Sequence, residues 1–221
     1  MNKKTLLSWS SGKDSAWTLH TLQQDPDIEL LGLFTVINEK YERASMHATR
    51  LELLKKQAET AKLPIEIISL PDQCSMEKCD EIMAEFTRRA ESQDIEQIAF
   101  GDLFLEDIRH YREKQLEGTT IKPIFPLWEI PTQELANQMI DSGLEAYVSS
   151  VDLSKLPAEF AGKKWNKELL LNIPAQCDPC GENGEIHTIV VNGPMFGHPI
   201  AVTVGETVIK SNFAYADIIP A

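Results

Sequence analysis

Apolar positions follow two different spacings over the first hundred residues of the chain. Short apolar runs predict buried strands at 5–9, 29–36, 65–70 and 98–100. Between these runs, apolar side chains recur at helical spacing over 14–24, 45–62 and 75–91. Strands that alternate with crossover helices predict an α/β fold with a parallel, doubly wound sheet that is covered on both faces.

The pattern changes in the second half of the chain. Helical spacing continues over 106–116 and 131–142, and further strands are predicted at 122–127 and 146–151. From 185 to 218, single apolar and polar residues alternate among glycines and prolines, as is typical of antiparallel strands. We therefore expect two units, a main domain over 1–125 and a smaller C-terminal unit of β character over 126–221.

The loop after the first predicted strand carries small polar residues and one cation. It reads Ser10-Ser11-Gly12-Lys13-Asp14-Ser15 and leads directly into a predicted helix. Free backbone N–H groups at a helix N-terminus favour an anion, glycine allows close backbone approach, and lysine adds positive charge. We expect this loop to bind the phosphates of a nucleotide, with a plain helix cap and turn as the alternative.

The Walker loop is excluded by the spacing of these residues. That motif requires a glycine at the position of Leu7, and a hydroxyl residue directly after the lysine. Here Asp14 separates Lys13 from Ser15. If the loop binds phosphates, it therefore does so in a way that differs from the Walker loop.

Two further loops are expected at the same edge of the sheet. Loops 37–47 and 101–112 each follow a predicted strand, and the carboxyl ends of parallel strands meet at one edge. His47, Gly101 and Asp102 are therefore candidate nucleotide-site residues. A helix cap is the alternative role for His47, and a common turn is the alternative for Gly101 and Asp102.

The charge balance limits the partners that we expect. The net charge is −13, from 34 acidic and 21 basic residues, and no block of like charge stands out. Such a field repels phosphate backbones and anionic lipids, so we expect no nucleic-acid partner and no membrane. The apolar run after Lys4 stops at Trp9, too early for a secretion signal, and we expect a cytoplasmic protein.

The four cysteines are expected to be thiols or ligands rather than structural disulfides. They are Cys74, Cys79, Cys177 and Cys180. Zinc bound by the two pairs and reactive thiol chemistry are alternatives. Plain buried or loop cysteines are favoured over both.

The N-terminal loop resembles the PP-loop, Ser-Gly-Gly-x-Asp-Ser, of the N-type ATP pyrophosphatases. Five of the six positions match, and Ser11 replaces a glycine. Taken with this loop, the stretch from Cys177 to Thr188 resembles the diphthine–ammonia ligase family and its bacterial relatives. Similar motifs follow in the family's order, at Ser45-Met46-His47, at Phe100-Gly101-Asp102 with Arg109 and Arg112, and at Pro126-Leu127-Trp128.

This resemblance implies a sheet of the PP-loop (HUP-like) type and an ATP-dependent ligase. A carboxylate, of a small acid or a protein, would be adenylated by ATP and then attacked by ammonia, with AMP and pyrophosphate released. Mg²⁺ would accompany the ATP, and Asp14 is the candidate ligand, with Asp102 beside it. Where the ligases usually read Gly-Gly-Glu, an aromatic residue and Glu-Thr, this chain reads Asn183-Gly184-Glu185-Ile186-His187-Thr188, which indicates a side branch and leaves the acceptor open.

Residues 182–188 are therefore expected to fold over the mouth of the nucleotide site. The candidate catalytic residues are Glu182, Glu185, His187 and Asp102, which could position ammonia or take its proton. The candidate substrate-binding residues are Asn183, Gly184 and Thr188.

Two other functions compete with the ligase. A PP-loop tRNA-modifying enzyme would use the cysteines for thiolation, but the net charge of −13 counts against an RNA substrate. A non-catalytic adenine-nucleotide-binding protein would have no use for the polar cluster at 182–188. The sequence leaves a homodimer open.

Overall fold

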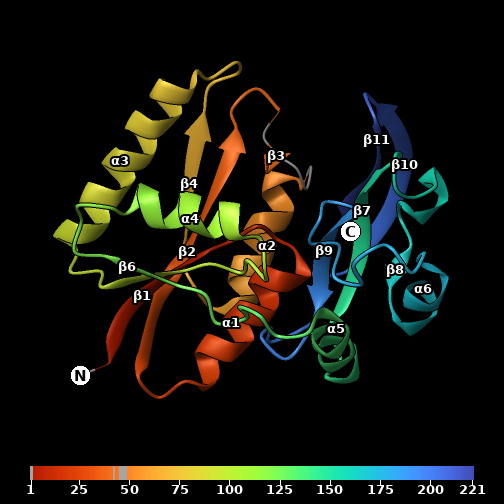
Figure 1. Cartoon of the computed structure of the whole chain (residues 1–221), viewed down its shortest axis with the longest axis horizontal. Coiled ribbons are helices and arrows are strands. Elements are labelled where there is room, and N and C mark those ends of the chain that lie inside the picture. The colour runs from red at the N-terminus through yellow and green to blue at the C-terminus, as the bar shows by residue number, and fades with distance from the viewer. Residues whose placement is uncertain (1, 42, 45–48) are drawn as a thin grey trace.

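A parallel sheet forms the first half of the molecule (Figure 1). The computed structural model describes residues 2–41, 43–44 and 49–221. The parallel strands are β1 (Lys3–Ser8), β2 (Ile28–Asn38), β4 (Ile65–Leu70), β5 (Gln97–Ala99) and β6 (Lys122–Ile124). A short strand, β3 (Arg43–Ala44), pairs antiparallel with the end of β2.

The order of the strands reverses at β1. Strand β1 pairs with β2 on one side and with β5 on the other, while β4 pairs with β2 and β6 pairs with β5. Ligands of open α/β sheets bind beyond the carboxyl ends of the strands at such a reversal. The loops that follow β1 and β5 therefore flank the position where a ligand is expected.

Helices cover both faces of this sheet, as the apolar pattern predicts. On one face, Leu33 packs into a cluster with Leu19 of α1 (Lys13–Gln24) and Leu54 of α2 (Leu51–Ala61). On the other face, its neighbour Phe34 packs with Phe86 of α3 (Met76–Ser92). Successive strand residues point to opposite faces, so both faces of β2 are buried.

Helix α2 begins later than the predicted helix at 45–62. Its N-cap, Arg50, has extended backbone angles, and the helix starts at Leu51. Residues 45–48 lie outside the described part of the chain. The strand predicted at 122–127 is also shorter, because a turn closed by a bond from Trp128 N to Phe125 O follows β6.

The second half is an antiparallel sheet with small helices. Its strands are β7 (Glu145–Asp152), β8 (Lys164–Trp165), β9 (Ile186–Asn192), β10 (Val202–Lys210) and β11 (Phe213–Pro220). Strand β7 is central and pairs with β8, β9 and β11. Helix α4 (Glu106–Gln115) lies between β5 and β6 of the first half. The helices of the second half are α5 (Thr132–Asp141), the short 3₁₀ turn η1 (Ala158–Phe160) and α6 (Lys167–Asn172).

The two sheets share a core. Helices α1 and α2 lie between them (Figure 1), and Leu53 of α2 is buried in a cluster with Ile189 and Ile200 of the second half. Within the described residues, no helix is both long and apolar enough to cross a membrane. The division into units at 125/126 stays a proposal, since the two halves pack against each other through α1 and α2.

Candidate functional site

A pocket of about 210 Å³ opens at the carboxyl edge of the parallel sheet. Three segments line it, namely the loop after β1 with the start of α1, residues 100–112 after β5, and residues 180–188 before and within β9. The loops at 10–15 and 101–112 meet at this edge as predicted, whereas the described residues of the third loop, 37–41 and 43–44, do not line the pocket. Residues 180–188 reach the same pocket from the far end of the chain, as expected. His47 lies outside the described residues.

Ser11 takes a left-handed backbone conformation within the loop. Its φ is 75°, a value that usually calls for glycine, and this is the position where the PP-loop pattern has one. A residue with a Cβ pays roughly 1–2 kcal/mol there. The side chain is fully buried, and its hydroxyl lies 2.6 Å from Thr49 Oγ1. The Ser11 hydroxyl is thus taken up by Thr49, and Ser11 does not line the pocket, so a phosphate contact by Ser11 stays a prediction.

The serines on either side of Gly12 close the loop around the start of α1. Ser10 Oγ bonds Ser15 Oγ at 3.0 Å, and Ser15 Oγ donates to the carbonyl of Gly12 at 3.0 Å. Ser10 and Ser15 line the pocket, whereas Gly12 does not. Gly12 is the N-cap of α1 and has no capping side chain, so the N–H groups of Asp14 and Ser15 in the first turn have no partner within the helix and can donate to an anion, whereas that of Lys13 bonds Thr188.

Lys13 is buried with its ammonium group against Asp14. Lys13 Nζ lies 2.8 Å from Asp14 Oδ2 and 5.6 Å from the centre of the Trp165 ring in the second half. Burial lowers the pKa of Lys13, but the Asp14 carboxylate, Cys180 and Glu182 outweigh it, and the pKa is raised overall. The pocket thus keeps a fixed positive charge at neutral pH.

Asp14 has one oxygen that the loop leaves without a hydrogen bond. Burial raises the pKa of Asp14, and the Lys13 ammonium opposes that rise. Oδ2 pairs with Lys13, while Oδ1 is buried and has no hydrogen-bond partner among the described residues. A buried oxygen of this kind is costly unless a ligand or ion satisfies it.

The loop after β5 brings a second carboxylate and an arginine. Asp102 Oδ2 lies 3.6 Å from Arg112 Nε of α4, and the guanidinium covers the Phe100 ring at 5.1 Å. Burial raises the pKa of Asp102, and Arg112 opposes the rise. Gly101 lies against the first turn of α1, because a Cβ there would be 3.0 Å from Asp14 C and Ser15 N. Only glycine fits this approach without a shift of the backbone.

Glu182 reaches from the second half to the loop after β5. Its Oε1 accepts a hydrogen bond from Leu103 N at 2.8 Å, and its own N–H donates to Asp178 Oδ2 at 2.9 Å. Burial raises the pKa of Glu182 to about 7. The carboxyl can therefore exchange a proton close to neutral pH.

His187 and Thr188 line the pocket from the start of β9. Burial, helped by the charge of Lys13, lowers the pKa of His187 to about 4, so the imidazole is neutral at pH 7. Thr188 Oγ1 accepts a hydrogen bond from Lys13 N at 3.1 Å. This bond joins the first turn of α1 to the second half.

Glu185 supports the turn rather than the pocket wall. It is buried, and its Oε1 accepts bonds from Asp178 N at 3.0 Å and Asn183 Nδ2 at 3.2 Å. Glu185, Asn183 and Gly184 do not line the pocket, while Glu182, His187 and Thr188 do. The position of Glu185 favours a structural role, and a catalytic role for it stays a prediction, as does substrate binding by Asn183 and Gly184.

A second cavity of about 240 Å³ adjoins the pocket. The two share Ser8, Phe100 and Arg112. The second cavity is lined mainly by apolar side chains of the strand ends, α3 and α4, such as Val36 and Met83. This cavity was not predicted from the sequence, because its walls come from strand ends, α3 and α4, which lie far apart in the chain.

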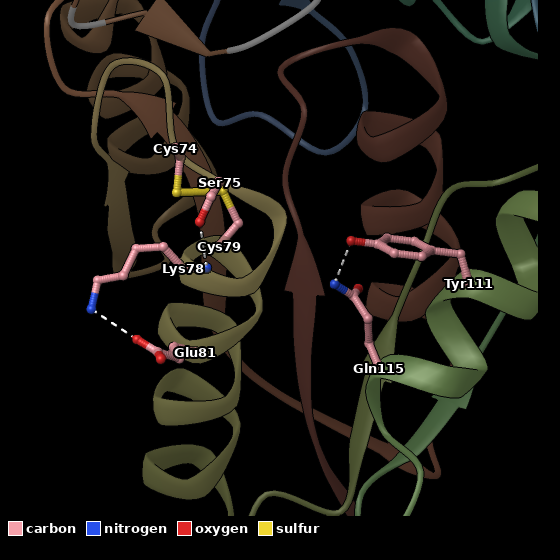
Figure 2. The surroundings of a disulfide bond; sticks show 7 residues. All are labelled: Cys74, Ser75, Lys78, Cys79, Glu81, Tyr111 and Gln115. Atoms are coloured by element: carbon pink, nitrogen blue, oxygen red, sulfur yellow. Dashed lines mark hydrogen bonds and ion pairs between the residues drawn. A yellow bond between two sulfur atoms is a disulfide. The ribbon is translucent and has the colours of Figure 1, made fainter.

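Cys74 and Cys79 form a disulfide, which contradicts the expectation that the cysteines are thiols or ligands (Figure 2). The start of α3 brings their Cα atoms to 6.0 Å. Between them Ser75 caps the helix by accepting a bond from Lys78 N. Cys79 also lines the second cavity.

Cys177 and Cys180 are buried free thiols. Burial raises the pKa of both, so neither is a thiolate at neutral pH. Cys180 Sγ donates to the Thr132 carbonyl at 3.4 Å. In the part of the chain that the structure describes, no three His, Cys, Asp or Glu side chains form a metal-binding group. The zinc and reactive-thiol alternatives therefore gain no support.

Both halves of the chain match models of one protein family. Residues 3–123 match the diphthamide synthase N-terminal domain, and residues 131–220 match the diphthamide synthase C-terminal domain. The chain belongs to the diphthamide synthase family. The segments that line the pocket come from both matched regions, so the pocket is built by the two family domains together.

The curated relatives of this diphthamide synthase family member are diphthine–ammonia ligases. The one from Schizosaccharomyces pombe is 31% identical over 123 residues, which are 54% of this chain and 20% of the relative. Those from Rattus norvegicus and Homo sapiens are 29% and 27% identical over 133 residues, 58% of this chain and 50% of each relative. The chain thus spans half or less of the length of these relatives.

A solved structure of a U34-tRNA thiolase from Methanococcus maripaludis is also similar. It is 20% identical, with a TM-score of 0.40, over 61% of this chain and 54% of the thiolase.

Proposed function

We propose that the chain binds ATP in this pocket and forms an amide from a carboxylate and ammonia. The observation that carries the proposal is that three segments converge on one pocket. The loop of residues 10–15, called the phosphate-type loop below, forms one wall, and Glu182, His187 and Thr188 form another. Membership of the diphthamide synthase family and the similarity to diphthine–ammonia ligases support the same chemistry.

The triphosphate would lie over the first turn of α1. Free N–H groups and the helix dipole favour anions there, and Ser10, Ser15 and Lys13 add donors on the pocket side. The adenine ring of ATP would lie in the adjoining apolar cavity, which meets the pocket at Ser8 and Phe100. This arrangement leaves the α-phosphate between the two cavities.

Mg²⁺ fits the carboxylates of this pocket. Asp14 Oδ1 is a buried oxygen without a hydrogen-bond partner among the described residues, and so is Asp102 Oδ2, which lies 3.6 Å from Arg112. Magnesium prefers such oxygen ligands together with phosphate oxygens. We assign Asp14 and Asp102 to hold it, where it would neutralise phosphate charge that two carboxylates alone would repel.

The reaction then has two steps. An acceptor carboxylate oxygen attacks the α-phosphorus of ATP, and pyrophosphate leaves. The nitrogen of ammonia attacks the acyl carbon, AMP leaves, and a base takes the surplus proton. Glu182, with its pKa near 7, is the candidate for that base, because it lines the pocket and can accept a proton close to neutral pH. His187 also lines the pocket, and its neutral imidazole, whose pKa is lowered to about 4, is suited to accepting a hydrogen bond from ammonia rather than to taking the proton.

The acceptor is a carboxylate of a small acid or of a protein side chain. Thiolation of tRNA is less well supported, since the free thiols Cys177 and Cys180 are buried with raised pKa values. The first experiment is calorimetric titration with ATP and Mg²⁺. We expect the wild-type chain to bind ATP. Asp14→Asn should lower the affinity at least tenfold, because the loss of one charge-assisted contact has roughly that effect.

The control for this titration is Asp94→Asn. Asp94 is an exposed carboxylate with a left-handed backbone, which asparagine tolerates. It should bind ATP as the wild type does. Equal affinity of the wild type and Asp14→Asn would remove the loop from the site.

A further inference from the structure

Gln57 is a fully buried polar residue in the middle of α2. Its Oε1 accepts a hydrogen bond from Trp9 Nε1 at 3.0 Å. Its Nε2 donates to two carbonyls, Ser11 O at 3.1 Å and Val190 O at 2.7 Å. The amide group thereby joins the end of β1, the phosphate-type loop and β9 of the second half.

The carbonyl of Ser11 is held from two sides. Besides the bond from Gln57, it accepts one from Val190 N at 3.0 Å. The peptide unit is planar and trans, so fixing this carbonyl turns the N–H of Gly12 the opposite way, where Ser10 Oγ accepts it at 3.3 Å. The orientation of the loop on the pocket side is thus set from behind the loop.

This hold explains how a serine keeps φ at 75°. A residue with a Cβ has no intrinsic preference for that conformation, so surrounding contacts must impose it. The contacts present are the Ser11 hydroxyl with Thr49 and the Ser11 carbonyl with Gln57 and Val190. A glycine at position 11 can adopt the same conformation without the strain that a Cβ brings.

We propose that Gln57 is a positioning residue for the nucleotide, acting through the loop. It does not line the pocket, and it fixes the backbone of Ser11 and Gly12 while tying β9, which carries His187 and Thr188, to the same loop. The proposal rests on the proposed binding of ATP by this loop. It assigns to Gln57 the joint orientation of the phosphate side and the acceptor side of the site.

The test compares Gln57→Met with a matched control, Thr60→Val. Thr60 lies one turn further along α2, is also buried, and also bonds the second half, through His198 O at 2.9 Å and His198 N at 3.1 Å. Both variants lose buried hydrogen bonds between α2 and the second half, but only Gln57→Met frees the loop. Gln57→Leu, which also removes the amide and brings no charge into the core, replaces Gln57→Met if that variant does not fold.

Two readouts separate positioning from plain stability. We expect Gln57→Met to weaken ATP binding by about tenfold or more and to speed amide hydrogen exchange at residues 11–13 by a similar factor in the free protein. Thr60→Val should lower the melting temperature while leaving both readouts unchanged. Adding Ser11→Gly to Gln57→Met should bring ATP affinity back to within about threefold of the wild type, because glycine needs no outside hold.

Wild-type affinity and exchange in a folded Gln57 variant would overturn the proposal. So would a failure of Ser11→Gly to restore the affinity lost in Gln57→Met. If the wild-type chain does not bind ATP at all, the proposed function falls, and the exchange comparison, which needs no nucleotide, still decides whether Gln57 holds the loop.

Discussion

The backbone N–H of Lys13 donates a hydrogen bond to Thr188 Oγ1 at 3.1 Å, although the two residues are 175 positions apart. The donor belongs to the first turn of α1, where N–H groups have no partner within the helix. The acceptor belongs to β9, on the other side of the pocket. This bond fixes the distance between the phosphate-type loop and the segment that carries Glu182 and His187.

Thr188→Val is expected to lower the free energy of unfolding by about 1–2 kcal/mol, because it leaves a buried N–H group without a partner. The variant keeps the shape of the side chain, so packing is nearly unchanged. Urea denaturation measures the effect. Thr188→Ser keeps the hydroxyl and should lose clearly less. Equal stability of Thr188→Val and the wild type would show that the bond is not formed in solution.

Gly101→Ala should disturb the contact between the loop after β5 and α1. The added Cβ would lie 3.0 Å from backbone atoms of Asp14 and Ser15, which cannot move aside without shifting the helix start. We expect a loss of about 1–3 kcal/mol in stability and weaker ATP binding.

Gly143→Ala is the control for this change. Gly143 has a φ of 84° and open space around it, so alanine there costs stability through the backbone alone. Calorimetric titration should find wild-type ATP affinity in Gly143→Ala and reduced affinity in Gly101→Ala. Retained affinity in both variants would contradict the close approach at Gly101.

Glu182 should make the folded state less stable as the pH rises. Its pKa is raised by burial from 4.5 to about 7, so the folded state holds a proton that the unfolded state has already released. This contribution to stability is full below pH 4.5 and is lost as the pH rises through 7. The stability of Glu182→Gln relative to the wild type should therefore increase from pH 5 to pH 8, measured by urea denaturation. A constant difference would show that the carboxyl is not desolvated.

His187 should act in the opposite direction. Burial lowers its pKa from 6.5 to about 4, so the unfolded state binds a proton first as the pH falls. Its contribution is full above pH 6.5 and is lost as the pH falls toward 4, by on the order of 3 kcal/mol. Glutamine does not titrate, so His187→Gln should not show this loss. Below pH 6 the free energy of unfolding of the wild type should therefore fall relative to that of His187→Gln. NMR titration of the imidazole offers a direct check, and a pKa above 6 would contradict its burial.

The strand and helix alternation and the pocket loops could be predicted from the sequence because their signals are local. Apolar spacing places β1 and α1, and the run of small residues from Ser10 to Ser15 marks the loop between them. The return of residues near Glu182 to this loop was not a local signal. It was expected from the family resemblance and from the cost of burying the carboxylates of 182–188 in a core.

The role of Gln57 could not be predicted in this way. Its three partners lie 46, 48 and 133 positions away, and only the folded chain brings them together. One signal was present, since Gln57 shares the buried stripe of α2 with Leu54 and Ala58, and a buried amide needs hydrogen-bond partners. The left-handed backbone of Ser11 could not be predicted either, because it depends on contacts from α2 and β9.

The cysteines show why composition alone misled. The expectation of a cytoplasmic protein favoured reduced thiols, and nothing in the spacing of Cys74 and Cys79 distinguishes a disulfide from a poor zinc site. The turn before α3, with Ser75 as its N-cap, decides how close the two side chains come. That turn is a property of the folded loop.

The central claim is that ATP bound in this pocket is split between the α and β phosphates. Phosphorus NMR of ATP incubated with the protein, Mg²⁺, ammonium and a panel of carboxylic acids measures this directly. We expect AMP and pyrophosphate to form with the acceptor acid, and to disappear in Asp14→Asn. ADP and phosphate as the main products, or AMP formation that persists unchanged in Asp14→Asn, would contradict the claim.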